Sequence, residues 1–161
     1  MTLCYIGLGS NLDDPAGQLR QALDALGKLP ATRLLKCSSF YRSRPLGGKD
    51  QPDYINAVAK LDTSLAALTL LDHLQRIESG QGRLRTEERW ASRTLDLDLL
   101  LYGDAQIRER NLRVPHPEIA GRNFVLCPLL EIDPDIEIPG QGPANTLLDK
   151  TGLAGLEKLL E

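Results

Sequence analysis

Two aspartates alternate with leucines in the segment Leu95-Asp96-Leu97-Asp98-Leu99. Residues i and i+2 of a strand project to the same face, so this pattern predicts a strand with its leucines in a core and both carboxylates on the opposite face. Aspartate is unfavourable in strands, and two carboxylates roughly 6.6 Å apart along a strand repel each other. A polyvalent cation that both carboxylates bind is the usual reason to tolerate such a pair. The segment therefore predicts a metal site.

Four arginines, Arg83, Arg85, Arg89 and Arg93, lie just upstream of this strand. A cation and several guanidinium groups that bind the same oxygens are typical of enzymes acting on polyphosphates. The alternative is structural: the two aspartates form the solvent-facing side of a half-buried sheet, balanced by a solvated basic loop. Threonine, lysine or glutamine would suit such a face better than aspartate, which favours the functional interpretation.

Length and composition indicate one domain spanning residues 1–161. The hydrophobic fraction of 42% and charged fraction of 25% are those of a globular protein, and a formal charge of −3 gives no overall attraction to nucleic acid or to an anionic membrane. No apolar run approaches the roughly 18 residues of a membrane span, and no signal sequence is recognised. We expect a cytoplasmic protein that binds neither nucleic acid nor membrane.

The three cysteines, Cys4, Cys37 and Cys127, are isolated and lie among apolar residues. This placement favours buried reduced thiols over a disulfide or zinc framework. A catalytic cysteine would need His73 or His116 as its base, and neither histidine stands in a recognisable motif with a cysteine.

The order of predicted elements is βαββαβ. Strands are expected at residues 3–8, 33–41 and 54–61 and at the aspartate segment, with helices that begin at caps Asp14 and Ser64. Two right-handed crossovers would close this order into an α+β fold, a ferredoxin-like core with an antiparallel sheet and its helices on one face. We therefore expect the functional site on the other face.

The last third is predicted to add a C-terminal hairpin and helix. Gly103-Asp104 is expected to turn a hairpin into residues 105–108, and two prolines make residues 114–117 extended. A short helix at 126–132, a short strand at 136–138 and a terminal helix at 147–160 complete the prediction.

Familiar phosphate-binding loops are absent from the sequence. Gly7-Leu8-Gly9-Ser10-Asn11-Leu12 follows a strand, but the leucine at position 12 breaks the dinucleotide-binding pattern, and no G-x-x-x-x-G-K-[ST] motif occurs. Phosphates would have to be held by arginine side chains and cations.

Several other residues are candidates whose structural alternatives stay open. His116, held between prolines, suits the mouth of a site or a partly exposed loop. Tyr54 and Asn56 share one strand face, where they would stack on and hydrogen-bond a flat heterocycle or serve as ordinary sheet residues. Arg122-Asn123-Phe124 adds a cation and a ring, and Trp90 in its charged loop favours an exposed or ligand-covering role over a core role.

Taken together, these residues resemble the hydroxymethyldihydropterin pyrophosphokinase family of folate biosynthesis. The motifs that carry the resemblance are Tyr5-Ile6-Gly7-Leu8-Gly9-Ser10-Asn11-Leu12, Gln51-Pro52-Asp53-Tyr54-Ile55-Asn56-Ala57, Arg93-Thr94-Leu95-Asp96-Leu97-Asp98-Leu99, Val114-Pro115-His116-Pro117 and Arg122-Asn123-Phe124-Val125-Leu126-Cys127-Pro128-Leu129. The resemblance implies transfer of pyrophosphate from ATP to the hydroxymethyl oxygen of the pterin, giving AMP and the pterin diphosphate. It implies ATP and hydroxymethyldihydropterin as the small-molecule partners, and we expect a monomer.

The resemblance also assigns roles to residues. Catalytic roles fall on Arg83, Arg93, Asp96 and Asp98, and the two aspartates would hold two Mg²⁺ ions. The pterin would contact Ser43, Leu46, Tyr54, Asn56, Trp90 and Phe124. The nucleotide would contact Gln75, Glu78, Arg85, Trp90, Arg93, Leu99, His116 and Arg122.

Two positions depart from the family pattern. Arg44 stands in Ser43-Arg44-Pro45 where Thr-Pro-Pro is common, and Thr86 stands where a basic residue can occur. These departures concern the loops rather than the chemistry.

Competing functions are disfavoured by composition. A metal-dependent nuclease would favour a basic surface, whereas this chain is acidic, and an RNA-binding sheet would need more aromatic residues than four Tyr, two Phe and one Trp. A regulatory ligand-binding module has no use for paired aspartates in a strand.

Overall fold

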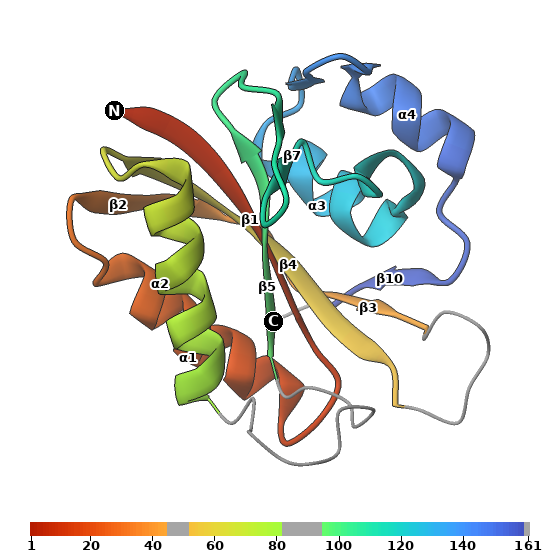
Figure 1. Cartoon of the computed structure of the whole chain (residues 1–161). Helices are drawn as coiled ribbons and strands as arrows, with labels where there is room; N and C mark the ends of the chain where they lie inside the picture. Colours follow the sequence, from red (N-terminus) through yellow and green to blue (C-terminus); the bar gives the residue numbers. More distant parts are fainter. Residues whose placement is uncertain (45–51, 82–94, 160–161) are drawn as a thin grey trace.

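The computed structural model describes residues 1–44, 52–81 and 95–159, and it is organised around one antiparallel sheet (Figure 1). The strands are β1 (Thr2–Ser10), β2 (Thr32–Cys37), β3 (Tyr41–Ser43), β4 (Tyr54–Thr63), β5 (Asp96–Tyr102), β6 (Ile107–Arg108), β7 (Arg113–Val114), β8 (Glu137–Ile138), β9 (Gly142–Pro143) and β10 (Leu156–Lys158). The helices are α1 (Pro15–Gly27), α2 (Ala67–Gly80), the 3-10 helix η1 (Ile119–Gly121), α3 (Asn123–Ile132) and α4 (Ala144–Thr151).

Strand β4 lies at the centre of the main sheet, whose order is β10-β3-β4-β1-β5 with β2 also paired to β4. Every pairing in it is antiparallel. The prediction of one strand at residues 33–41 is wrong, because β2 and β3 are separate strands that pair with successive parts of β4. Between them, the Ser38 hydroxyl accepts a hydrogen bond from the amide of Val58 at 2.9 Å. The Ser38 side chain therefore serves in place of a backbone acceptor at the break between β2 and β3.

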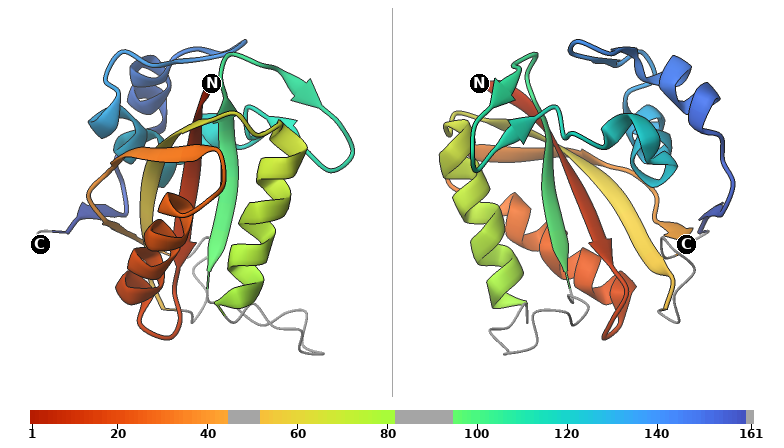
Figure 2. Two further views of the ribbon diagram at one scale, coloured as in Figure 1. Left: turned by 90° about the vertical axis from the view of Figure 1, so that its left-hand side faces the viewer. Right: turned by 45° about the vertical axis from the view of Figure 1, so that its right-hand side comes forward.

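Helices α1 and α2 cover one face of the sheet, as Figures 1 and 2 show. The core on this face includes Ile6, Leu8 and Leu97 from the strands and Leu19 and Leu74 from the helices. Both core helices thus lie on one face, as expected from the sequence.

The predicted helix caps had different outcomes. The Asp14 carboxylate accepts a hydrogen bond from the amide of Gly17, and Pro15 opens α1, so the first cap is confirmed. The second is wrong: α2 begins at Ala67 without a side-chain cap, because Ser64 lies too far upstream of the helix.

The opposite face of the sheet is covered by α3, with α4 outside it (Figure 2). Side chains of β1, β4 and β5, including Tyr5, Val58 and Leu100, pack there against Leu126 and Leu129 of α3. This confirms the predicted helix at 126–132, which begins three residues earlier. Helices therefore lie on both faces, and the open part of the second face lies beside the start of α3.

Two predictions for the C-terminal third are wrong. The hairpin after Gly103 pairs β6 with β7, so residues 107–108 leave β5 and pair with 113–114. The terminal helix ends at Thr151, where Gly152 has a φ of +79°, and the chain then adds β10 to the sheet edge. A left-handed glycine ends a helix readily, since it has no Cβ to clash. The predicted strand at 136–138 is confirmed as β8.

Candidate active site

The aspartate strand β5 has the alternation that its sequence predicts. Leu97 and Leu99 are buried in the core beneath α1 and α2, while Asp96 and Asp98 are half-buried on the other face. In the register of the sheet, Gly9 of β1 lies opposite Asp96 and Gly7 lies opposite Asp98. Because glycine has no side chain, other groups approach the strand at these two positions: the Leu100 side chain lies 3.3 Å from where a Cβ of Gly7 would be, and Asn56 Nδ2 lies 3.1 Å from where a Cβ of Gly9 would be.

A buried glutamate stabilises this strand from the side of α2. Glu78, which is 4% exposed, accepts a hydrogen bond from the backbone N–H of Leu97 at 2.7 Å. Within the part of the chain that the structure describes, strand β5 is the edge of the sheet, and its outer backbone groups have no strand partner there. Glu78 therefore binds the backbone between the two aspartates.

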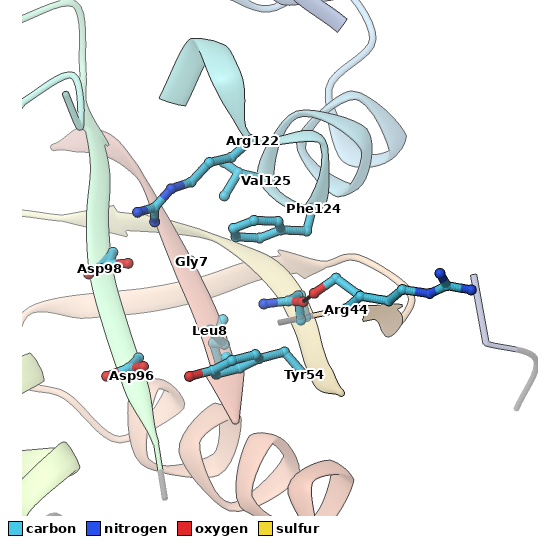
Figure 3. Close-up of a pocket in the computed structure, with 13 residues that line it drawn as sticks. Gly7, Leu8, Arg44, Tyr54, Asp96, Asp98, Arg122, Phe124 and Val125 are labelled. Atoms are coloured by element: carbon cyan, nitrogen blue, oxygen red, sulfur yellow. Dashed lines mark hydrogen bonds between the residues drawn. The ribbon is translucent and has the colours of Figure 1, made fainter. Parts of the chain in front are cut away.

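The first pocket, which we call the aromatic pocket, has a volume of about 300 Å³. It is lined by Gly7, Leu8, Gly9, Ser43, Arg44, Tyr54, Asn56, Ala57, Asp96, Asp98, Arg122, Phe124 and Val125. Figure 3 shows the rings of Tyr54 and Phe124 on two sides of a gap, with Asp96 and Asp98 along its third side. Such a gap suits a flat ring whose substituent points at the carboxylates.

Asn56 lies in this pocket with its amide held in one orientation. The Ser43 hydroxyl donates to Asn56 Oδ1 at 2.6 Å, which leaves the Nδ2 group as the donor on the other side of the amide. The two residues come from neighbouring strands, because β3 pairs with β4 through Ser43 opposite Tyr54. A fixed amide recognises the polar edge of a heterocycle without first losing rotational freedom.

Arg122 extends from the start of α3 toward Asp98 (Figure 3). Its guanidinium lies 5.5 Å from the ring centre of Phe124, and its Nη2 is 3.1 Å from a Glu118 carboxylate oxygen. Its Nε is buried, and the described residues offer it no hydrogen-bond acceptor. A buried unpaired donor is costly, so this group favours an anionic ligand at this place.

A second pocket, which we call the arginine pocket, lies on the other side of Asp98. Its volume is about 260 Å³, and it is lined by Leu71, Leu97, Asp98, Leu99, Arg110, Asn111, Leu112, Arg113, His116 and Pro117. Leucine side chains form an apolar part, and two arginines lie at its rim. Asp98 lines both pockets, so ligands bound in the two pockets would meet at this carboxylate.

His116 is held as a neutral imidazole at the arginine pocket. Its Nδ1 accepts a hydrogen bond from the backbone N–H of Glu118 at 3.1 Å, and its own backbone N–H donates to Leu100. Burial, with a contribution from Arg122, lowers its pKa, although Asp98 and Glu118 oppose this effect. With Nδ1 as acceptor, the ring proton is placed on Nε2, which is then a donor for a ligand.

The two aspartates fit a magnesium ion that arrives with a phosphate ligand. Among the described residues, no group of three or more His, Cys, Asp or Glu side chains is placed to hold a metal. Mg²⁺ is commonly bound through one or two carboxylates, with phosphate oxygens and water as its other ligands. A carboxylate pair at the junction of two pockets matches that pattern.

The structure brings together most of the residues proposed for the pterin. Ser43, Tyr54, Asn56, Phe124, Asp96 and Asp98 all line the aromatic pocket, while Leu99 and His116 line the arginine pocket. Arg122, expected at the nucleotide, lines the aromatic pocket instead. Gln75 is exposed on α2 and lines neither pocket, and Glu78 faces the backbone of β5. Leu46, Arg83, Arg85, Trp90 and Arg93 lie outside the described residues.

Sequence reasoning missed several residues of the two pockets. Gly7 and Gly9 were considered as part of a failed phosphate motif and of a family motif, but neither was predicted to line a pocket. Arg110 lies in the turn between β6 and β7 and Arg113 begins β7, and no local pattern associates them with His116.

Comparisons with known proteins find a family model and relatives that match this chain. A sequence model of the 7,8-dihydro-6-hydroxymethylpterin-pyrophosphokinase (HPPK) family matches residues 5–134. The chain is 54% identical over 139 residues to a 2-amino-4-hydroxy-6-hydroxymethyldihydropteridine pyrophosphokinase of Haemophilus influenzae, covering 86% of each chain. It is 48% identical over 155 residues to the Pseudomonas aeruginosa protein of the same name, covering 96% of this chain and 95% of the relative.

A solved structure shares the fold at low sequence identity. Plasmodium falciparum HPPK-DHPS with pteroate superimposes with a TM-score of 0.75 at 12% identity, over 92% of this chain. The present chain spans only 42% of that longer protein. Among the described residues, no helix is both long and apolar enough to cross a membrane.

Proposed function

Because the chain belongs to the 7,8-dihydro-6-hydroxymethylpterin-pyrophosphokinase family, we propose that it transfers pyrophosphate from ATP to 6-hydroxymethyl-7,8-dihydropterin in folate biosynthesis. The products are AMP and the pterin diphosphate. The observation that carries this proposal is the sharing of Asp98 by an aromatic pocket and an arginine pocket. The reaction needs one site for a flat ring and one for a nucleotide, with a metal-binding group between them.

The pterin is assigned to the aromatic pocket. Tyr54 and Phe124 would stack on its two faces, and the Nδ2 group of Asn56, oriented by Ser43, would donate to its polar edge. In this orientation the hydroxymethyl group would point toward the carboxylate strand. Ser43 would act mainly through Asn56, since its hydroxyl is already used in that hydrogen bond.

The nucleotide is assigned to the arginine pocket. Leu71 and Leu99 would pack on the adenine, and the Nε2–H of neutral His116 would donate to the nucleotide. Arg110 and Arg113 at the rim are cations within reach of a polyphosphate chain. The unpaired Nε of Arg122 would meet phosphate oxygens near Asp98.

The transfer step requires placement more than a strong base. The hydroxymethyl oxygen forms a bond to the β-phosphorus, the bond from that phosphorus to the α–β bridging oxygen breaks, AMP leaves, and the hydroxyl proton passes to solvent. Asp96 and Asp98 would hold magnesium, two ions in our proposal, which when bound neutralises phosphate charge. Arg122, with Arg83 and Arg93 proposed from the sequence, would stabilise charge on the transferred group.

Other expectations also stay proposals. We propose that residues 1–161 act as one pyrophosphokinase domain and that its core is ferredoxin-like, which the order β5-β1-β4-β2 supports. We expect the protein to be a monomer and to act in the cytoplasm, where ATP is available. Light scattering on the purified chain tests the monomer.

The test is to incubate the protein with ATP and Mg²⁺, with and without 6-hydroxymethyl-7,8-dihydropterin, and to separate the nucleotides. We expect AMP only when the pterin is present, in equal amount to the pterin diphosphate. The matched control is 6-methyl-7,8-dihydropterin, which keeps the ring and lacks the attacking hydroxyl. Formation of ADP, or of AMP with the methyl compound, would contradict the proposal.

A further inference from the structure

Helix α3 is attached to the sheet through a carboxylate in its last turn. Glu131 accepts hydrogen bonds from the Tyr41 hydroxyl at 2.6 Å and from the backbone N–H and the hydroxyl of Ser39, each at 2.9 Å. These hydrogen bonds lower the pKa of Glu131, against the opposing effect of its partial burial. One ionised carboxylate thus joins α3 to Tyr41 of β3 and to Ser39, two residues before that strand.

A second carboxylate beyond the same end of α3 makes a similar contact. Asp133 accepts a hydrogen bond from the Tyr5 hydroxyl and pairs with Lys60 at 3.1 Å. Tyr5 lies on β1 and Lys60 on β4, where the two residues are directly paired. The end of α3 is therefore held by strands β1, β3 and β4.

Helix α3 is also held nearer its start, where the Asn123 side-chain amide donates to the carbonyls of Gly152 and Ala154, each at 3.0 Å, and Leu126 is buried against the sheet. It has no side-chain cap at its start, and Pro128 in its interior cannot donate the backbone hydrogen bond of a regular helix. Its first residues nevertheless carry Phe124, which forms one wall of the aromatic pocket. The position of that wall therefore depends both on these local contacts and on the attachment of the far end of the helix through Glu131.

Strand β3 connects the attachment of α3 to the opposite wall. Tyr41 is paired across the sheet with Asn56, and Ser43, two residues further on, donates to the Asn56 side chain. The carboxylate of Glu131 and the amide of Asn56 are thus both held by the same three-residue strand. Movement of β3 relative to α3 would change the separation of the two walls.

We propose that Tyr41 and Glu131 are positioning residues that set the gap between Phe124 and the Tyr54–Asn56 wall, and hence the affinity for the flat-ring substrate. Neither residue lines the aromatic pocket, so the effect is indirect. The inference rests on the proposed assignment of the pterin to this pocket. The affinity would then depend on residues outside the pocket as well as on those that line it.

The test compares Tyr41→Phe with Tyr102→Phe. The Tyr102 hydroxyl donates to the Leu65 carbonyl at 2.6 Å, and its ring packs against the core under α1 and α2, away from α3. Both variants delete one part-buried phenol hydroxyl with a hydrogen bond of equal length. The Kd of the pterin and of a non-hydrolysable ATP analogue with Mg²⁺ are measured by calorimetry, together with Tm.

We expect Tyr41→Phe to raise the pterin Kd about fivefold, because the bound pterin must then restore a wall position that the hydrogen bond no longer holds, with the nucleotide Kd within about twofold of wild type. Tyr102→Phe loses a hydrogen bond to a neutral carbonyl rather than to a carboxylate, so it should lower Tm by a similar or smaller amount and change neither Kd. Glu131→Gln, which keeps one oxygen for Tyr41, should give a smaller rise than Glu131→Ala.

Wild-type turnover separates this inference from the proposed function. If the wild type makes AMP from ATP and the pterin but Tyr41→Phe and Glu131→Ala both bind pterin normally, the positioning role is refuted and the function stands. Equal changes of the pterin Kd in Tyr41→Phe and Tyr102→Phe would also refute it. Absence of wild-type turnover would instead overturn the function.

Discussion

A methyl group added at Gly9 tests the pterin assignment most directly. The Cβ of Gly9→Ala would lie 3.1 Å from Asn56 Nδ2 and 4.0 Å from the Tyr54 ring. The first distance is too short by a few tenths of an ångström, so the amide must shift. That shift stretches the 2.6 Å hydrogen bond from Ser43 and moves the Nδ2 donor away from the ligand.

Loss of one neutral hydrogen bond costs about 1 kcal/mol, and a misplaced donor facing the ligand adds a similar amount. We therefore expect pterin binding to weaken by about 1–2 kcal/mol, about 5- to 30-fold in Kd. The backbone of Gly9 does not have a positive φ, so alanine fits its strand conformation. The free energy of unfolding should change by less than about 1 kcal/mol.

The assay is calorimetric titration with pterin and, separately, with the ATP analogue and Mg²⁺. Gly80→Ala is the matched control, since no heavy atom lies within 4 Å of its added Cβ, and it should bind both ligands as wild type does. In Ser43→Ala the Asn56 amide is free to move, so adding Gly9→Ala to that variant should cost less than it does in wild type. A Gly9→Ala protein with unchanged pterin affinity would refute the assigned slot.

Three further predictions concern charged groups. Asp96→Ala and Asp98→Ala should each lower kcat by orders of magnitude, and normal turnover would exclude the metal role. Chemical denaturation should show an unfolding free energy that is unchanged or raised, because repulsion between the two carboxylates is relieved. Glu78→Ala should lower the unfolding free energy by about 1–3 kcal/mol, because the buried Leu97 N–H loses its acceptor, and Glu78→Gln should cost less. Equal stability of both variants would contradict this. The hydrogen bond from the Tyr5 hydroxyl, together with Lys60, lowers the pKa of Asp133 below its usual 3.8. The ionised carboxylate therefore stabilises the fold above about pH 4, and this stabilisation is lost as the pH falls further. The difference in unfolding free energy between wild type and Asp133→Asn should shrink in acid, and a constant difference would count against the contact.

Strand β5 shows how much of the site follows from local sequence. The alternation of Asp96 and Asp98 with leucines placed both carboxylates on one face because side-chain direction in a strand depends only on the backbone's period of two. Asp14 and Pro15 marked the start of α1 for an equally local reason, since a cap bonds amides within its own turn. Tyr54 and Asn56 reached one pocket by the same periodicity.

Contacts between elements that are distant in the sequence were decided by the tertiary structure. The break between β2 and β3 arises where Ser38 bonds Val58 of the neighbouring strand, and the role of Glu78 depends on the open edge of β5. No local pattern contains either contact, because the partners are 20 and 19 residues apart. The position of α3 likewise depends on Glu131, 90 residues from Tyr41. The sequence by itself therefore determined which side chains share a face. Long-range packing alone set the distance between Phe124 and the Tyr54–Asn56 wall and brought the two pockets together at Asp98.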